Sequence, residues 1–536
     1  MVHLCLLMER AVTCAVVKTD CLHLPPGLLM NVSNEKSVSL WMDTTVLGEA
    51  PALDRQEKAD VVIIGSGIAG MSVAYELAKA GKSVVILDRG PIGKGMTSRT
   101  TAHLTAQCDD GFDLMIKRRG EVLTKAWYQS QVAGIDRIEA IIQDLGIACD
   151  FRRLDGHLFH APGTDEGIID REFEATRKVG MEVYRKKGVP LVGQAKTPAL
   201  RYPNQATFHP LKYLAGLAAA IQDAGGRFYA DTIAQEVKET DDGVEITTVG
   251  DHRVLASQAV VATNAPINDR YAIHSKQAPY RTYAMAFSVP KDALPDGLYW
   301  DTLEAYHYVR LQPGRGKTHI LIVGGADHKS GEADDANARF LALEAWMRNL
   351  LPDLGKELHR WSGQILDTID YAAFIGLNPG SKRTFVSTGD SGQGITHGAV
   401  AGLLISDLIL KSKSPWTAVY DPNRKPVKAA GTFISENLTA ATNFAEYIAP
   451  GEKTSWDDLK PGEGAIVRKG LSKVAAYRDE KGKLFLRSAA CPHLGCHLHW
   501  NSFEHCWDCP CHGSQFAPDG TALNGPAFSS LAEYKA

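Results

Sequence analysis

The stretch DVVIIGSGIAG, residues 60–70, decides the fold of this 536-residue chain. Residues 61–64 form an apolar run that ends in glycine, which is typical of a buried parallel strand. Helical spacing follows over residues 70–80, and a second buried strand is predicted over residues 83–87, ending at Asp88. A strand, a helix and a second strand within about 30 residues predict a βαβ unit.

The glycines of this stretch match the pattern G-x-G-x-x-G between a strand and a helix. Gly65 permits the tight turn, Gly67 lets the backbone approach a pyrophosphate, and Gly70 lets the helix and strand pack closely. The helix N-terminus attracts negative charge, and Asp88, 18 residues after Gly70, can accept hydrogen bonds from ribose hydroxyls. The unit therefore predicts a dinucleotide site, but it does not decide between FAD and NAD.

Other stretches favour FAD. Residues 95–101 follow the second strand and carry hydroxyls that can meet a ribityl chain or diphosphate. Residues 260–264 form an apolar strand that ends in small polar residues, and residues 389–398 form a second glycine-rich turn from strand to helix. Backbone N–H groups of that turn can face a flavin carbonyl, and Asp390 can bind ribityl hydroxyls. No second strand–GxGxxG–helix unit follows in the sequence, which disfavours a flavin reductase with a separate NAD(P)H domain.

Together with Tyr308-Val309-Arg310 and Trp361-Ser362-Gly363, this set resembles the FAD-dependent oxidoreductases of the glycine/D-amino acid oxidase (DAO) family over about residues 58–425. The resemblance implies FAD, bound covalently or not, and oxidation of a carbon–nitrogen bond. Cys108 and Cys149 are candidate attachment points for the flavin, although buried thiols are the commoner case. The expected FAD contacts are Gly65, Gly67, Ile68, Ala69, Gly70, Asp88, Arg89, Thr100, Thr101, Val237, Thr263, Asn264, Gly389, Asp390, Gly392, Gly394, Ile395 and Thr396.

Half of the ten cysteines lie in the last 46 residues. A local cysteine cluster in a long chain indicates a metal site rather than a disulfide framework. Cys491-Pro492-His493 and Cys509-Pro510-Cys511-His512 give the pattern C-x-H followed by C-x-x-H. Two thiolates and two imidazoles suit either zinc or a Rieske-type [2Fe–2S] cluster.

The surrounding residues resemble a Rieske domain over about residues 451–536. Residues 491–496 and 509–514 look like the two cluster loops, and Gly525-Pro526-Ala527 resembles the proline loop that covers the cluster. Zinc remains the alternative. The resemblance implies four ligands, with Cys491 and Cys509 on one iron and His493 and His512 on the other.

The same resemblance implies a disulfide between the extra cysteines, Cys496 and Cys511, although a reducing compartment disfavours it. Ser514 stands where Rieske proteins place a hydroxyl donor to cluster sulfur, and Phe516 stands where high-potential members have tyrosine. Hydrogen bonds to sulfur raise the reduction potential, so this pattern predicts an intermediate value.

We expect an α/β FAD-binding, Rossmann-like fold with a mixed-sheet substrate domain, followed by a small all-β Rieske domain. Strands in the middle of the chain are predicted over residues 227–237, 243–249 and 254–263. The expected segments are a partly disordered N-terminal extension (1–58), the oxidoreductase domain with its substrate-side insertions (59–426), a connecting helix or linker (427–450) and the Rieske domain (451–536).

Composition narrows the classes of function. With 58 basic and 62 acidic residues, the net charge of −4 argues against a general nucleic-acid binder. The sequence lacks an uninterrupted apolar run of about 18 residues, so we expect no transmembrane segment. Glu9 and Arg10 interrupt the apolar start of the chain, which makes a poor signal peptide. A cytoplasmic location is therefore expected.

A flavin accepts two electrons together, as a hydride, whereas a [2Fe–2S] cluster transfers one electron at a time. A chain with both cofactors is therefore predicted to convert two-electron transfer into one-electron transfer. We expect an amine or amino acid to be oxidised, with electrons leaving through the cluster to an acceptor, which is a protein, a quinone or oxygen. In the first alternative the flow is reversed, and the cluster feeds the flavin for substrate reduction. In the second, the Rieske domain is a non-catalytic, redox-responsive or docking module on a flavoprotein.

Catalytic residues are harder to assign. Tyr306, Tyr308 and Arg310 alternate along a predicted strand, and Arg310 can bind a carboxylate in bidentate fashion. The alternative is a purely structural strand. His397 lies in the flavin-side turn and can approach the ring, or it is a capping or core histidine. Tyr308, Arg310 and His397 are therefore the catalytic candidates.

Overall fold

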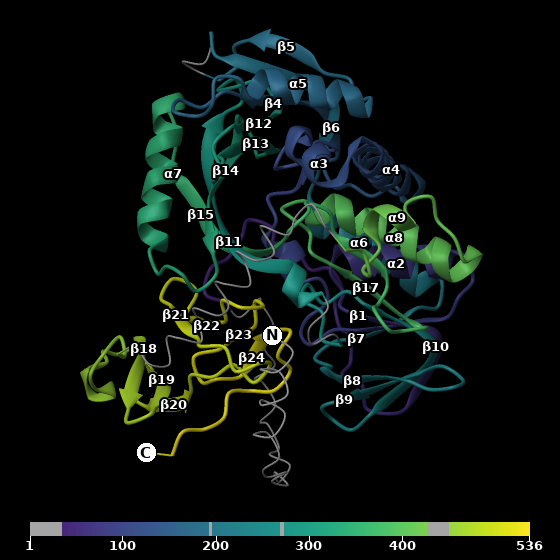
Figure 1. The fold of residues 1–536 in the computed structure, drawn as a ribbon, viewed down its shortest axis with the longest axis vertical. Helices are drawn as coiled ribbons and strands as arrows, with labels where there is room; N and C mark the ends of the chain where they lie inside the picture. Colours follow the sequence, from purple (N-terminus) through teal and green to yellow (C-terminus); the bar gives the residue numbers. More distant parts are fainter. Residues whose placement is uncertain (1–34, 192–195, 269–272, 426–449, 536) are drawn as a thin grey trace.

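The computed structural model describes residues 35–191, 196–268, 273–425 and 450–535 (Figure 1). The predicted connecting segment, 427–450, lies outside the described residues except for Pro450. Residues 1–34 of the N-terminal extension lie outside them too.

The first sheet is built around the βαβ unit that the sequence predicts. Its central strands are parallel, in the order β17-β10-β1-β2-β7, and β16 pairs antiparallel with β17. The valine and isoleucine runs of β1 and β2 are buried, as expected for strands covered on both faces. The strands are β1 (Glu57–Ile64), β2 (Val84–Leu87), β7 (Arg227–Tyr229), β8 (Ala234–Glu239), β9 (Val244–Thr248), β10 (Arg253–Val261), β16 (Phe374–Leu377) and β17 (Thr384–Thr388).

The prediction of a single strand over residues 227–237 is wrong, because the structure has two strands there, β7 and β8. Residues 230–233 leave the sheet between them. Asp231 has a φ of 49°, and the backbone N–H of Thr232 donates to the Asp88 carbonyl at 2.7 Å. The break brings residues 232–234 to the cavity described below.

The second sheet is mixed, because β4 and β12 pair in parallel while the other pairs are antiparallel. Its order is β15-β11-β14-β13-β12-β4-β6-β3, with β5 beside β6, and α7 (Ala336–Leu350) packs on β11 and β14. This is the predicted substrate domain. The strands are β3 (His103–Leu104), β4 (Arg152–Phe159), β5 (Tyr184–Lys187), β6 (Pro198–Thr207), β11 (Gln277–Pro290), β12 (Leu298–Asp301), β13 (Tyr308–Pro313), β14 (Thr318–Lys329) and β15 (Glu357–Thr368).

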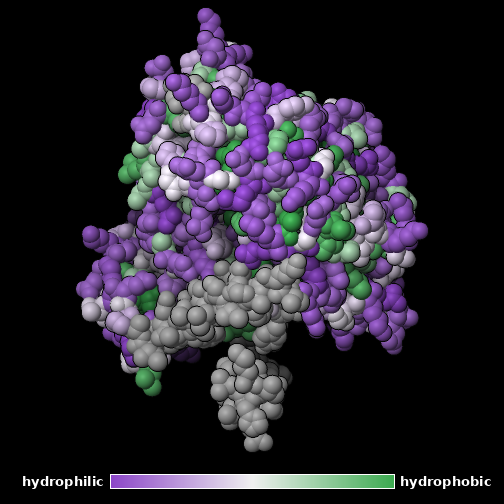
Figure 2. Space-filling model, turned by 45° about the horizontal axis from the view of Figure 1, so that its top comes forward, coloured by the Kyte–Doolittle hydropathy of each residue, from purple (hydrophilic) through white to green (hydrophobic). Residues whose placement is uncertain are grey.

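Helix α8 (Gly394–Lys411) is the one described helix that is long and apolar enough to cross a membrane. Most of it is buried, since it packs against α2 (Ile68–Lys79) and α4 (Glu121–Leu145). A Cβ at Gly402 would lie 2.8 Å from the Ser72 side chain, so glycine permits this close packing. The face of the molecule in Figure 2 is mostly hydrophilic. The remaining helices are η2 (Met96–Arg99), α3 (Phe112–Arg119), α5 (Ile168–Val179), α6 (Pro210–Asp223), η3 (His274–Lys276), α9 (Thr417–Tyr420) and η5 (Trp456–Asp458).

The C-terminal region is all β, as predicted, and its strands pair antiparallel in two small sheets (Figure 1). Loop 491–496 lies in the segment that connects β20 to β21, and loop 509–514 joins β22 to β23. The strands are β18 (Gly464–Lys469), β19 (Ser472–Arg478), β20 (Leu484–Ser488), β21 (His499–Asn501), β22 (Cys506–Asp508), β23 (Gln515–Phe516) and β24 (Ala522–Asn524).

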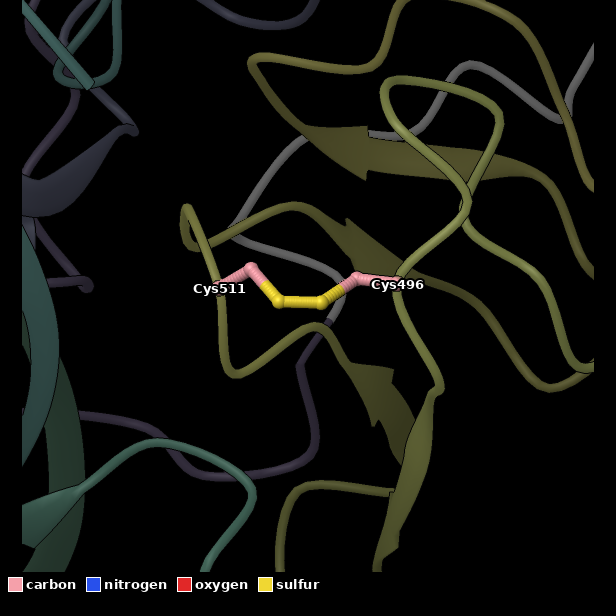
Figure 3. The surroundings of a disulfide bond; sticks show 2 residues. All are labelled: Cys496 and Cys511. Carbon is pink, nitrogen blue, oxygen red and sulfur yellow. A yellow bond between two sulfur atoms is a disulfide. The ribbon is translucent and has the colours of Figure 1, made fainter. Parts of the chain in front are cut away.

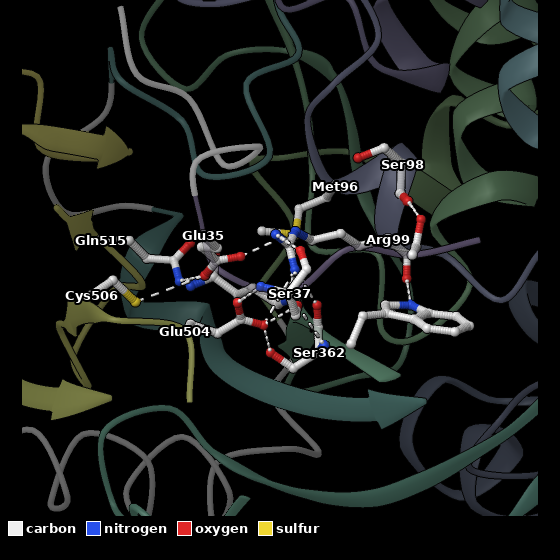
Figure 4. Close-up of polar contacts among 12 residues, drawn as sticks. Glu35, Ser37, Met96, Ser98, Arg99, Ser362, Glu504, Cys506 and Gln515 are labelled. Carbon is white, nitrogen blue, oxygen red and sulfur yellow. Dashed lines mark hydrogen bonds and ion pairs between the residues drawn. The ribbon is translucent and has the colours of Figure 1, made fainter. Parts of the chain in front are cut away.

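A buried ionic cluster joins the N-terminal extension and both domains (Figure 4). We call Glu35, Arg99, Arg281, Glu504 and Asp508 the interface cluster; each side chain is at most 4% exposed. Glu35 lies 3.1 Å from the Arg99 guanidinium and 3.2 Å from that of Arg281. Arg281 also lies 2.9 Å from Asp508, so the first described residue of the extension is fixed between the domains.

Replacing Arg281 with methionine is expected to lower the free energy of unfolding by about 3–5 kcal/mol, because two carboxylates then stay buried without this cation. Urea unfolding of the holoprotein, followed by tryptophan fluorescence, measures the loss. The matched control is Arg348→Met, which removes a half-exposed ion pair with Glu344 on α7 and should cost less than about 1 kcal/mol. Equal, small losses in both variants would contradict the prediction.

Candidate active site

A long cavity runs from the dinucleotide motif, through the glycine-rich turn at residues 389–394, to the second sheet. All the predicted FAD contacts line it except Gly70, Val237 and Thr396. Gly70 instead packs against Gly65 and Ile63, which is the packing role that the motif gives it. Val237 of β8 pairs with Ile246 of β9, and the hydroxyl of Thr396, in α8, donates to the carbonyl of Thr105.

The dinucleotide end of the cavity has the expected polar groups. Asp88 accepts hydrogen bonds from the backbone N–H groups of Ser66 at 2.8 Å and Gly90 at 3.1 Å, while burial raises its pKa. A Cβ at Gly67 would meet only the Thr97 hydroxyl, at 3.2 Å, so the backbone here is open to the cavity. Nη1 of Arg89 is buried without a hydrogen-bond partner beside this space. A carboxylate for ribose and a guanidinium with an unused donor fit the ADP half of FAD.

His397 lies on the cavity, as predicted, but its ring is held by the protein. Its Nδ1 bonds to the Asp390 carbonyl at 3.0 Å, and its Nε2 accepts from the Trp127 indole N–H at 3.2 Å. Burial lowers the pKa of His397 to about 4, so the ring is neutral near pH 7. This histidine therefore positions the turn at Asp390 and the first residues of α8.

The far end of the cavity is acidic and aromatic. The Tyr306 hydroxyl donates to Asp109 at 2.8 Å, and its ring lies 5.6 Å from that of Tyr308. Burial raises the pKa of Asp109 to about 7 and that of Asp327 to about 6. Oδ1 of Asp327 is buried without a hydrogen-bond partner. Tyr308 lines this end as predicted, whereas no sequence motif marked Asp109 or Asp327.

The predicted carboxylate clamp at Arg310 does not fit the structure. Arg310 is fully buried and does not line the cavity. Its Nη1 donates to the carbonyls of Thr101 and Ala102, each at 2.9 Å, which satisfies the buried cation within the protein. Cys108 and Cys149, the candidate flavin attachment points, are also buried and outside the residues that line the cavity.

The two cysteine–histidine loops share one backbone pattern. In each, the glycine at the fifth position donates its N–H to the carbonyl of the first cysteine: Gly495 to Cys491 at 2.8 Å, and Gly513 to Cys509 at 3.1 Å. Both glycines have positive φ, 73° and 83°. The thiols of Cys491 and Cys509 hydrogen-bond to each other, so the loops bring together the cysteines predicted to bind one iron.

The two predicted histidine ligands also meet. The rings of His493 and His512 have centroids 5.0 Å apart. Nδ1 of His512 is buried without a hydrogen-bond partner, and burial lowers the pKa of His512 to about 2. The ring is therefore neutral, the form that binds metal. A thiol pair beside an imidazole pair fits a cluster with one cysteine-bound and one histidine-bound iron.

A disulfide joins the loops through Cys496 and Cys511, whose Cα atoms are 6.4 Å apart (Figure 3). The Sγ atoms of Cys496, Cys509 and Cys511 lie within 4.8 Å of one another. Ser514 hydrogen-bonds to Cys491, and its Oγ accepts from the Ala527 N–H in the proline loop at 3.0 Å. The Ser514 hydroxyl therefore lies beside Cys491, one of the predicted cluster ligands.

Comparison with known proteins agrees with both sites. The family model described as FAD dependent oxidoreductase (DAO) matches residues 60–408, and the model described as Rieske [2Fe-2S] domain matches residues 453–535. A protein of Bacillus subtilis (strain 168) named as a Rieske 2Fe-2S iron-sulfur protein, YhfW, is 33% identical over 502 residues. The alignment covers 93% of this chain and 98% of that relative.

Other relatives match the first domain. Gamma-glutamylputrescine oxidoreductase of Escherichia coli (strain K12) is 26% identical over 376 residues, covering 67% of this chain and 85% of that relative. The crystal structure of glycine oxidase from Geobacillus kaustophilus has the same fold, with a TM-score of 0.57 and 20% identity, and covers 69% of this chain and 99% of that chain. This chain therefore belongs to the FAD-dependent oxidoreductase (DAO) family and carries a C-terminal Rieske domain, which makes it an oxidoreductase that uses FAD and a Rieske [2Fe–2S] cluster.

Proposed function

We propose that the enzyme oxidises a carbon–nitrogen bond of an amine or amino acid and sends the electrons through its cluster to an acceptor. The observation that carries this proposal is the shared cavity. Its wall includes Tyr306 and Tyr308 of the oxidoreductase domain and Asn524 and Gly525 of the Rieske domain. FAD supplies two-electron oxidation, and the cluster supplies one-electron transfer. The relatives named glycine oxidase and gamma-glutamylputrescine oxidoreductase support the substrate class.

The charges at the far end of the cavity favour an amine over an α-amino acid. Among the described residues that line the cavity, the arginines are Arg89, at the dinucleotide end, and Arg99, which is paired with Glu35 in the interface cluster. The far end instead presents Asp109 and Asp327. Two buried carboxylates attract an ammonium group and repel a substrate carboxylate.

The residues around Asp109 suit both binding and proton transfer. Tyr306 donates to one carboxylate oxygen and so orients the group, and its aromatic ring offers a face to a cation. A carboxylate with a pKa of about 7 can take a proton from a bound ammonium group, which must be neutral before its carbon is oxidised. We assign Asp109 as the proton acceptor and Tyr306 and Tyr308 as substrate-positioning residues.

The acceptor in this proposal is a protein, a quinone or oxygen, and the location is cytoplasmic. Helix α8 packs against α2 and α4 in the core, so this apolar helix is not available to a bilayer.

The direct test is an absorbance and low-temperature EPR spectrum of the purified protein, before and after anaerobic addition of monoamines, diamines and α-amino acids. We expect an amine to bleach the flavin and to produce a rhombic Rieske signal. Flavin that stays oxidised with every amine and amino acid, but is reduced by a donor protein through the cluster, would support reversed flow. Two intact cofactors that neither reduce each other nor respond to any substrate would support the non-catalytic role.

Replacing Phe516 with tyrosine is expected to raise the reduction potential of the cluster. Phe516 is fully buried in the same core as Cys491 and Cys509, and a hydroxyl there adds a hydrogen-bond donor near cluster sulfur. Potentiometric titration followed by EPR measures the shift. Phe485→Tyr, at the edge of that core, is the control and should leave the potential unchanged. A lower or unchanged potential in the Phe516 variant would contradict the assignment.

A further inference from the structure

The wall between the cavity and the cluster loops includes the buried amide of Gln364, in β15. The side chain lines the cavity, and the residue is 3% exposed. Its Nε2 donates to the carbonyl of Gly513 at 2.9 Å, and Gly513 directly follows the cluster ligand His512. A single side chain of the oxidoreductase domain therefore contacts both the flavin cavity and loop 509–514.

The other end of this amide is bonded as well. Oε1 of Gln364 accepts from Nδ2 of Asn264 at 3.1 Å and from Nδ2 of Asn524 at 3.0 Å. Asn264 lies on the cavity in the oxidoreductase domain, and Asn524 lies on it in the Rieske domain. A buried amide bonded at both ends has one favoured orientation, so it fixes the groups that it joins.

The fit around Gly513 is close. Its φ is 83°, and a Cβ there would lie 3.0 Å from Nε2 of Gln364 and 3.2 Å from Pro279. The loop can therefore approach the oxidoreductase domain this closely because the residue is glycine.

His274 shows independently which edge of the cluster loops faces the oxidoreductase domain. This residue of η3 is 2% exposed, and its ring packs 5.1 Å from that of His493 and 5.4 Å from that of His512. The histidine edge of the cluster site thus faces the domain that holds the flavin.

We propose that Gln364 is a positioning residue that holds loop 509–514 against the wall of the flavin cavity and thereby sets the rate of electron transfer between the two cofactor sites within one chain. This inference rests on the proposed passage of electrons between flavin and cluster. The flavin would supply two electrons one at a time: at each transfer one Fe(III) of the cluster would become Fe(II) and would pass its electron to the acceptor before the second transfer, and the proton lost by the flavin would go to water.

The test reduces the flavin with light and EDTA under anaerobic conditions, so it needs no amine substrate. Absorbance follows the flavin, and freeze-quenched EPR follows the appearance of the reduced cluster. Gln364→Leu removes all three hydrogen bonds, and Gln364→Glu keeps the size of the side chain but loses the donor to Gly513. We expect both variants to slow cluster reduction by about tenfold or more, as expected for a loosened reaction geometry.

The matched control is Asp334→Ala, at another contact between the two domains. Asp334 accepts from the N–H and hydroxyl of Ser502, at 2.9 and 2.8 Å, and does not line the cavity. This variant should transfer electrons at the rate of the unmodified protein. FAD content and the EPR g-values after dithionite reduction should be unchanged in every variant, which separates positioning from loss of a cofactor.

The outcomes distinguish the two proposals. If photoreduced flavin in the unmodified protein never reduces the cluster, the proposed passage of electrons from flavin to cluster is wrong. The inference about Gln364, which rests on it, is then wrong too. If transfer occurs but both Gln364 variants match the Asp334→Ala control, the role of Gln364 is wrong while the electron flow stands. If Gln364→Leu fails to fold, Gln364→Glu alone decides, since it conserves shape.

Discussion

Asp109→Asn is expected to lower kcat/KM for a cationic amine by about 10²-fold or more, because general acid–base groups contribute about 10²–10⁴-fold. The asparagine is the same size and can still bond to Tyr306, but it neither attracts an ammonium group nor takes its proton. Stopped-flow reduction of the flavin by the best amine of the panel measures the effect without any dependence on the acceptor.

The control for this variant is Asp113→Asn, a nearby acid on α3 that pairs with Lys117 and lies outside the cavity lining. It should leave flavin reduction by the amine unchanged. If the two variants behaved alike, Asp109 would have no special role in the reaction.

The pH dependence gives a second check on Asp109. Burial raises its pKa to about 7, and the hydrogen bond from Tyr306 lowers it. The carboxyl group is therefore neutral below that pH and charged above it, so kcat/KM for a cationic amine should rise as the pH increases through about 7. Tyr306→Phe removes the hydrogen bond that favours the charged form and should move this rise to higher pH. A rise that persists unchanged in Asp109→Asn would assign it to another group.

Cys509→Ser is expected to abolish the rhombic EPR signal and to stop turnover with a one-electron acceptor, while an amine still reduces the flavin. Cys509 is fully buried, and its thiol bonds to that of Cys491 at the point where the two loops meet. A serine hydroxyl is a harder, less acidic ligand than a thiolate and does not replace it on iron. Iron analysis and EPR measure the cluster, and anaerobic absorbance measures the flavin.

Cys506→Ser is the matched control for this variant. Cys506 is also buried and lies three residues before Cys509, but it contacts Glu35 and Asp508 rather than the two cluster loops. It should keep the cluster and the turnover. Loss of amine-driven flavin reduction in Cys509→Ser but not in Cys506→Ser would contradict the prediction that the flavin is reduced without help from the cluster.

The dinucleotide end of the site could be predicted because its residues lie within one short stretch. Gly65, Gly67 and Asp88 belong to a local strand–helix–strand unit, whose geometry follows from hydrophobic pattern and glycine placement. The cluster loops are equally local, and the family and fold class that they implied are confirmed.

The substrate end could not be predicted in the same way. Asp109 and Asp327 come from distant stretches that meet only in the folded chain, and neither stands in a motif. Arg310 was misassigned because alternation along a strand identifies a face but not what that face borders. The interface cluster was equally hidden, since Arg99 and its partner Glu504 are 405 positions apart.

The interface cluster also limits how this chain can be shortened. A protein ending near residue 450 would lack Glu504 and Asp508, leaving Arg99 and Arg281 with Glu35 as the remaining carboxylate of the cluster. The cut would also uncover Phe340, which is fully buried and whose ring packs 4.8 Å from that of Phe503, and newly exposed apolar surface favours aggregation of the expressed fragment. The fused domains are in this sense mutually dependent, since each covers buried groups of the other.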